Sequence, residues 1–212
     1  MKKPNMFFDY GGFLFNYDFD RQTLFRAHDI ALRHLNSEGL NFNLDQLSKA
    51  HNEAINTYLE ARRDFTEWPM DKIMTLMLGN LGIHSADLTS QMSEIYKLND
   101  HDSTPKGNSL KILNDLALTK KLGIISNLPH DSLIYELERY GMKGLFDTIT
   151  ISYEVGVRKP HPRIYTEAMK RANVKPGDCL FVSHDDEEVN GARAVGMEAV
   201  LADSLEEMIG VL

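Results

Sequence analysis

The sequence predicts an α/β fold: a three-layer, Rossmann-like core with a parallel sheet, and an all-helical cap of four helices inserted into it. Three observations predict this architecture. Short apolar runs typical of strands alternate with amphipathic stretches typical of helices, an order that favours a parallel sheet covered on both faces. Three of the strand-like runs lead directly into polar residues. Between residues 16 and 100 the helical periodicity continues without a strand signal.

The core elements follow from these runs. The expected strands are apolar or alternate with polar residues, and they cover residues 6–8, 121–126, 147–152, 179–183 and 198–202. The expected helices of the core cover residues 109–119, 131–140, 162–172 and 187–195. In open parallel sheets the ligand site lies beyond the carboxyl ends of the strands. Asp9, Ser126 and Ser183 occupy three such ends, so we expect them to lie close together.

The inserted segment has the residue pattern of helices alone. Apolar residues at spacings of three and four predict four helices, near residues 20–35, 44–63, 71–81 and 86–98. The stretch TPKG at residues 104–107 predicts a turn back into the core. The predicted domains are therefore a core of residues 1–15 and 101–212 and a helical cap of residues 16–100.

Composition limits the classes of function. The chain has 212 residues and a formal net charge of −8, which argues against binding to nucleic acid or to an anionic membrane surface. A single cysteine excludes an intrachain disulfide and favours a reducing compartment. The first apolar run ends at Asp9, too early for a signal peptide, and no run is long enough to span a bilayer. We expect a cytoplasmic protein with a small-molecule substrate; the sequence does not indicate an oligomeric state.

Four residue types in this arrangement point to hydrolysis of an anionic group. Asp9 is the candidate nucleophile, because a carboxylate at a strand end can form a covalent ester or acyl phosphate that water then hydrolyses. Gly11 and Gly12 would let backbone N–H groups approach a phosphate closely. Ser126 could donate a hydrogen bond to the transferring group. Lys159 could neutralise its charge and keep Asp9 ionised.

Polar neighbours of these positions are further candidates. Asn127 follows Ser126, and Ser183 ends a later strand, so both are expected to bind the substrate or its phosphate. His161 and His184 lie beside the same segments and are candidates to enter the site. Each of these residues also has a plainer interpretation as a turn, cap or surface residue.

Four segments, in order along the chain, resemble the four motifs of the haloacid dehalogenase (HAD) superfamily. They are FFDYGGFLFN around Asp9, GIISNLP around Ser126, EVGVRKPHPRIY around Lys159, and CLFVSHDDEEVNGARAVGM near the C-terminus. The helical insertion falls where a C1-type cap belongs. The resemblance covers the whole chain, and it implies a hydrolase, with a phosphate monoester as the favoured substrate and an aspartyl intermediate on Asp9.

The sequence also departs from the family pattern. Gly11 stands where most HAD phosphatases have a second Asp as general acid, and Phe13 stands where most have Thr. The resemblance implies a magnesium ion held by Asp9, the Gly11 carbonyl and acidic residues of the fourth motif. In that motif Ser183 replaces the first Asp and Glu188 the later one, with Asp185 as a substitute ligand. The sequence therefore leaves both a magnesium-dependent and a metal-free site open.

Two alternatives remain open at this point. The first is a metal-independent hydrolase like the 2-haloacid dehalogenases, which resemble this chain at Ser183, Asp185, Glu188 and Tyr165. That branch also needs a cap arginine, and the nearest basic residues are Arg33 and His34. The second alternative is a HAD domain that has lost catalysis and keeps a binding role.

Overall fold

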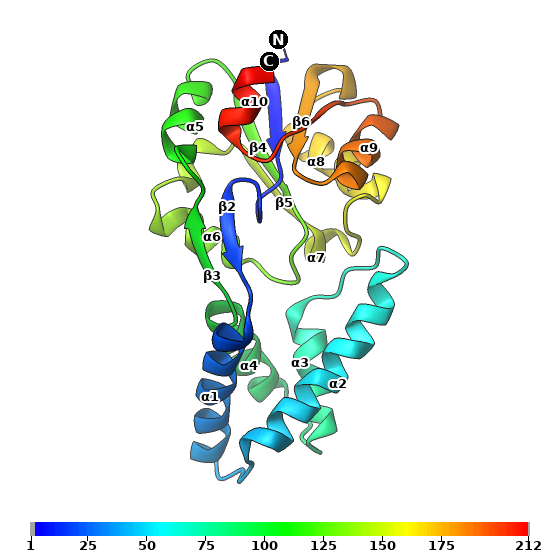
Figure 1. Ribbon diagram of the computed structural model, residues 1–212. Coiled ribbons are helices and arrows are strands. Elements are labelled where there is room, and N and C mark those ends of the chain that lie inside the picture. Colours follow the sequence, from blue (N-terminus) through cyan, green and yellow to red (C-terminus); the bar gives the residue numbers. More distant parts are fainter. Residues whose placement is uncertain (1–2, 212) are drawn as a thin grey trace. The chain divides into compact units, whose positions relative to one another are not determined.

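The computed structural model describes residues 3–211, which fall into two compact units. One unit comprises Met1–Tyr17 and Ser103–Leu212 and has an α/β fold; the other, Asp18–Asp102, is helical (Figure 1). The divisions lie two residues beyond the expected ends of the core segment at 15 and of the cap at 100. We refer to the two units as the core unit and the helical unit.

A parallel sheet of five strands forms the centre of the core unit and confirms the predicted fold class. Its strands, in the order β5-β4-β1-β6-β7, are Thr148–Ile151, Lys121–Ser126, Asn5–Phe8, Cys179–Ser183 and Glu198–Leu201. All neighbouring strands run parallel. Phe8 of β1 lies opposite Ile124 of β4 and Val182 of β6. The residues that follow β1, β4 and β6 therefore meet at one edge of the sheet.

Helices cover both faces of this sheet because successive strand residues point to opposite sides. On one face, Met6 and Phe8 of β1 pack with residues of three helices: α5 (Ser109–Ala117), α6 (Ser132–Arg139) and α10 (Leu205–Val211). On the other face, Phe7 packs with α8 (Pro162–Ala172) and α9 (Asp186–Ala194). Short helical turns complete the unit: α7 (Ser152–Val155) and the 3-10 turns Lys143–Leu145 and Pro176–Asp178.

Two short strands correct the sequence analysis. β2 (Phe15–Asp18) and β3 (Asp102–Pro105) form a two-stranded sheet, although residues 16–100 were expected to lack strands and residues 104–107 to form a turn. Most of their side chains are exposed or half-buried, so hydrophobic periodicity gave no signal. Their pairing satisfies backbone groups that neither strand could satisfy alone. Helix α10 was also missed.

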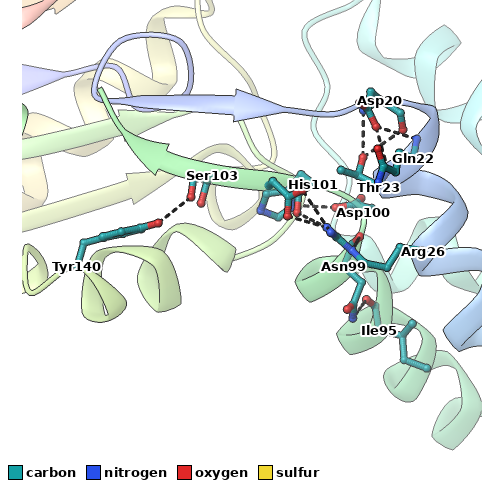
Figure 2. A network of polar contacts seen from close by, with 11 residues as sticks. Asp20, Gln22, Thr23, Arg26, Ile95, Asn99, Asp100, His101, Ser103 and Tyr140 are labelled. Carbon is teal, nitrogen blue, oxygen red and sulfur yellow. Dashed lines mark hydrogen bonds and ion pairs between the residues drawn. The ribbon is translucent and has the colours of Figure 1, made fainter. Parts of the chain in front are cut away.

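The helical unit contains the four expected helices. They are α1 (Arg21–Ser37), α2 (Leu44–Arg62), α3 (Met70–Asn80) and α4 (Ala86–Asn99). Asp20 begins α1 with a capping box, in which its side chain accepts from the Gln22 and Thr23 backbone N–H groups (Figure 2). Arg26 of α1 donates to the carbonyls of Asn99, the last residue of α4, and of His101 beyond it, which ties the two ends of the unit together (Figure 2).

The core of the helical unit holds an unusual polar cluster. His28 of α1, His51 of α2 and Tyr96 of α4 are buried, with ring centroids 4.9–5.7 Å apart. Among residues 3–211, no group forms a hydrogen bond with His28 Nε2, His51 Nδ1 or the Tyr96 hydroxyl. Burial of an unpartnered polar atom is costly, so this cluster is a strained part of an otherwise apolar core. No helix within residues 3–211 has the length and hydropathy needed to cross a membrane.

Candidate active site

The strand ends bring two buried carboxylates against one buried lysine. Asp9 directly follows β1, and its Oδ1 lies 2.5 Å from Lys159 Nζ. Glu188, in the first turn of α9, places Oε2 at 2.8 Å from the same ammonium. The Lys159 side chain is 0% exposed, and these two carboxylates balance its buried charge. Asp9 and Lys159 were both predicted as site residues, and they lie in direct contact.

Asn127 holds the lysine segment in place. Its Oδ1 accepts from the Lys159 backbone N–H at 2.7 Å, and its Nδ2 donates to the Lys159 carbonyl at 3.2 Å. The same Nδ2 donates to Glu188 Oε1 at 3.1 Å. Asn127 was expected to bind substrate; the structure gives its amide a positioning role on the wall of the site.

Two further groups fix Glu188. Ser183 Oγ donates to Glu188 Oε2 at 2.7 Å, and the Tyr165 hydroxyl donates to the Glu188 carbonyl at 2.7 Å. Both side chains are fully buried. Ser183, expected to bind substrate, therefore lies beneath Glu188. The Tyr165 side chain extends from α8 to α9. Gly191 of α9 has no side chain, and this leaves room for the Tyr165 hydroxyl.

His184 completes the surroundings of Asp9. Its Nδ1 lies 3.1 Å from Asp9 Oδ2, the oxygen that Lys159 does not contact. The ring also lies against Gly12: a Cβ added there would come within 2.7 Å of His184 Cε1. Gly12 has φ +84°, a conformation that also favours glycine. The sequence identified His184 as a candidate to enter the site, although nothing in the spacing shows which way its ring points.

The ionisation of these groups follows from burial and charge. Burial alone would raise the pKa of Asp9, but the charge and hydrogen bonds of Lys159 and His184 outweigh it, and the pKa is lowered. Burial raises the pKa of Glu188, and the Lys159 charge only partly opposes this. The hydrogen bond to Asp9 raises the pKa of His184. Asp9 is therefore the stronger acid of the two carboxylates, as a nucleophile requires.

A pocket of about 360 Å³ opens at this edge of the sheet. Its walls come from the segments that follow β1, β4 and β6, together with β2 and the segment before Lys159. The lining residues are Asp9, Gly11, Gly12, Tyr17, Ser126, Asn127, Leu128, Arg158, His184, Asp185 and Glu188. The pocket therefore presents carboxylates, a basic side chain, an imidazole and a hydroxyl to a small polar molecule.

The glycine loop after Asp9 differs from its expected role. The Gly12 N–H donates to the Phe15 carbonyl at 2.8 Å within a tight turn, and its carbonyl accepts from Lys106 Nζ at 2.8 Å. Its N–H is thus used by the fold and does not face a phosphate. Gly11 lines the pocket beside Tyr17. Phe13 is fully buried and stacks on Phe8, so it belongs to the core of the unit.

The other predicted positions fall into two groups. Ser126 is 2% exposed and lines the pocket, with no protein partner for its hydroxyl within residues 3–211, so the hydroxyl can serve a ligand. Asp185 lines the pocket too, but its Oδ1 accepts from the Glu187 and Glu188 N–H groups as the N-cap of α9. His161 caps α8 and does not line the pocket.

In the helical unit, the basic residues considered for carboxylate binding have other partners. Arg33 pairs with Asp29 on the exposed side of α1, at 2.6 Å. His34 Nε2 bonds the Gln91 side chain at 2.7 Å.

Comparisons with known proteins give the family. Over 102 residues the chain is 36% identical to the glyceraldehyde 3-phosphate phosphatase of Methanothermobacter thermautotrophicus, a match that covers 47% of this chain and 45% of that protein. The chain thus spans less than half of that relative. The 2-haloacid dehalogenase of Pseudomonas syringae pv. Tomato DC3000 superposes with a TM-score of 0.65 at 21% identity, over 94% of this chain and 86% of that one. The magnesium-bound HAD-hydrolase YfnB of Bacillus subtilis superposes with a TM-score of 0.59 at 14% identity, over 100% and 99%.

At these identities the two solved structures show a shared fold and nothing more. The family model of haloacid dehalogenase-like hydrolases matches residues 44–202, well over half of the chain. The chain therefore belongs to the haloacid dehalogenase-like hydrolases.

Proposed function

We propose that this protein hydrolyses a small phosphate monoester, with Asp9 as the nucleophile and the helical unit as a C1-type cap. The observation that carries the proposal is the buried contact between Lys159 and Asp9 at the edge of a pocket that Ser126 also lines. A lowered pKa keeps Asp9 ionised for attack. The named phosphatase among the relatives supports a phosphate ester as the substrate class.

The chemistry uses groups already placed at the site. An Asp9 oxygen attacks phosphorus, and the bond from phosphorus to the ester oxygen breaks; the leaving oxygen keeps the electron pair and takes a proton from water. Water then attacks the acyl phosphate and releases inorganic phosphate and the free Asp9 carboxylate. Ser126 donates to a phosphoryl oxygen, and Lys159 offsets the negative charge of the transferring group. Domain closure by a cap would exclude bulk water from these steps.

A magnesium ion was the cofactor implied by the resemblance, with Asp9, the Gly11 carbonyl, Asp185 and Glu188 as its ligands. Magnesium demands about six oxygen ligands in near-octahedral geometry. Here the Asp9 oxygens face two nitrogen donors, and both Glu188 oxygens accept hydrogen bonds from protein groups. Asp185 caps a helix. This donor set does not fit a magnesium ion, so we assign no step to one.

A dehalogenase-like reaction receives less support from the same residues. Ser183, Asp185 and Glu188, three of the positions in that resemblance, lie at the start of α9, and Tyr165 of α8 donates to the Glu188 carbonyl. Arg33, one of the two basic residues considered for binding a carboxylate substrate, pairs instead with Asp29 on an exposed helix face. Hydrolysis of 2-haloacids is therefore kept as an alternative outcome of the test.

The test is hydrolysis of a broad panel of phosphate monoesters by the wild type and by Asp9→Asn. We expect turnover by the wild type and a loss of at least about 10³-fold in the variant, since the nucleophile carries the reaction. Asp115→Asn is the matched control, because Asp115 is exposed on α5, where it pairs with Lys111; its activity should equal that of the wild type.

Mass spectrometry of a rapidly quenched reaction adds a direct readout. We expect a peptide containing Asp9 to carry one phosphoryl group. Turnover of 2-haloacids without turnover of any phosphate ester would replace the proposed function with the dehalogenase reaction. Equal activity of Asp9→Asn and wild type would remove Asp9 from the mechanism.

A further inference from the structure

The two oxygens of Asp9 lie in different surroundings. Oδ1 contacts Lys159, whose side chain is 0% exposed and does not line the pocket. Oδ2 contacts His184, whose side chain is 40% exposed and does line it. Oδ2 is therefore the oxygen on the pocket side, where a substrate arrives, and His184 is the group that covers it.

The position of His184 is built into the fold. It follows Ser183 at the end of β6, where buried pairing with β1 fixes the backbone: the Asp9 N–H donates to the Val182 carbonyl at 2.9 Å. On the other side the ring fills the space that a side chain at Gly12 would take. Only glycine at position 12 permits this approach, so two separate segments hold the imidazole against Asp9.

The imidazole lies where a divalent cation bound to Oδ2 would lie. A cation coordinated through this pocket-side oxygen would have to displace the His184 nitrogen, which is 3.1 Å from it. Glu188, the other acidic candidate, has its oxygens bonded by Ser183, Asn127 and Lys159. Protein donors thus contact both oxygens of Asp9 and both oxygens of Glu188.

We propose that His184 acts in place of a divalent cation, as a catalytic donor that first binds Asp9 Oδ2 and then the transferring phosphoryl oxygen, so that hydrolysis needs no metal. The inference rests on the proposed phosphatase function. In the resting site the imidazole N–H donates to Oδ2. An incoming phosphoryl oxygen accepts this N–H, and the freed Oδ2 lone pair attacks phosphorus.

The proton on His184 stays on the ring through this exchange. The Oδ2–phosphorus bond forms as the bond to the ester oxygen breaks, and the leaving oxygen takes its proton from water. When water hydrolyses the acyl phosphate, the N–H returns to Oδ2. His184 therefore stabilises charge where a metal would, and it performs no acid–base step.

One experiment measures cation binding independently of turnover. Metal-stripped protein is titrated with Mn²⁺ and bound ion is counted by electron paramagnetic resonance. We expect wild type and Asp9→Asn to bind Mn²⁺ equally weakly. We expect Ser183→Asp with His184→Ser, which restores a carboxylate and removes the imidazole, to gain binding that a further Asp9→Asn change abolishes. Asp9-dependent binding by the wild type would overturn the inference.

Kinetics supply the second readout. We expect wild-type turnover to be the same with magnesium and with chelator. His184→Ala should lower kcat by about 10²–10³-fold, the usual cost of removing a donor to a developing oxyanion. His184→Asn should recover most of this loss, because its amide nitrogen can take the place of Nδ1. His84→Ala, an exposed histidine of the helical unit, is the matched control and should be unchanged.

Together, the Mn²⁺ titration and the kinetics distinguish failure of the proposed phosphatase function from failure of the role proposed for His184. No turnover of any phosphate ester, with or without magnesium, would overturn the proposed function, and the Mn²⁺ titration would still decide whether His184 has replaced a cation. Turnover that requires magnesium, or full activity of His184→Ala, would overturn the role of His184 while the proposed function stands.

Discussion

The buried histidines of the helical unit make its stability depend on pH. His51 is 4% exposed, and its Nδ1 has no hydrogen-bond partner in the described part of the chain. The neighbouring His28 and Tyr96 rings offer no negative charge to balance an imidazolium. Burial therefore lowers the pKa of His51 from 6.5 to about 3, with a smaller effect from His28. The folded protein keeps His51 neutral, whereas the unfolded chain protonates it as the pH falls below 6.5.

The sign and size of the effect follow from this difference. Above pH 6.5 both states are neutral at His51 and the stability is fully present. Below it the unfolded state binds the extra proton, so stability falls by about 1.4 kcal/mol for each pH unit until the pH reaches about 3. At about pH 5 the expected loss from His51 alone is about 2 kcal/mol. His28, whose pKa burial also lowers, adds to the loss in the same direction.

Urea denaturation followed by far-ultraviolet circular dichroism, at about pH 8 and about pH 5, measures this loss. His51→Gln keeps a polar side chain that does not titrate, and its loss between the two pH values should be about 2 kcal/mol smaller than that of the wild type. His84→Gln, at an exposed position, should follow the wild type. Equal pH dependence in wild type and His51→Gln would refute the argument, because it would mean that the imidazole is protonated in the folded state.

Three further changes test the site. Lys159→Met leaves Asp9 and Glu188 buried without their shared cation and should lower the free energy of unfolding by about 3–5 kcal/mol, measured by urea denaturation at neutral pH. Tyr165→Phe removes the donor to the Glu188 carbonyl and should cost about 1 kcal/mol by the same measurement; an unchanged value would mean that this bond is not formed in solution. Gly12→Ala adds a Cβ at 2.7 Å from the imidazole of His184, at a residue with positive φ. We expect it to lower the free energy of unfolding by about 1–2 kcal/mol and also to lower kcat. A loss of stability with normal kcat would contradict the packing of this ring.

The fold was predictable because its signals are periodic and local. Strands β4 and β6 have the expected bounds of 121–126 and 179–183, since their apolar runs are bounded by polar residues on both sides. The four helices of the inserted segment start within a residue or two of the expected positions. Strands β2 and β3 were not predicted, because pairing between distant exposed segments leaves no hydrophobic pattern in either segment.

The candidate site was predictable only in part. Strand ends indicated Asp9, Ser126 and Ser183 as neighbours, because the carboxyl ends of parallel strands meet at one edge of the sheet. The sequence does not show in which direction each of these side chains points. The structure turns Asn127 and Ser183 toward Lys159 and Glu188, where they position charged groups, and turns His184 toward the nucleophile.

The charges at the site explain why His184 is needed. Asp9 and Glu188 share one ammonium, and all three groups are buried, so a single lysine leaves one negative charge without compensation. A raised pKa lets Glu188 relieve this by taking a proton, but Asp9 must stay ionised to attack. The donor at 3.1 Å from Asp9 Oδ2 is then the group that keeps the nucleophile charged in the resting site, before the substrate accepts the N–H. If His184 lacked this role, its removal should leave the pKa of Asp9 unchanged; we expect instead that His184→Ala raises it, seen as a shift to higher pH of the acidic limb of kcat/KM.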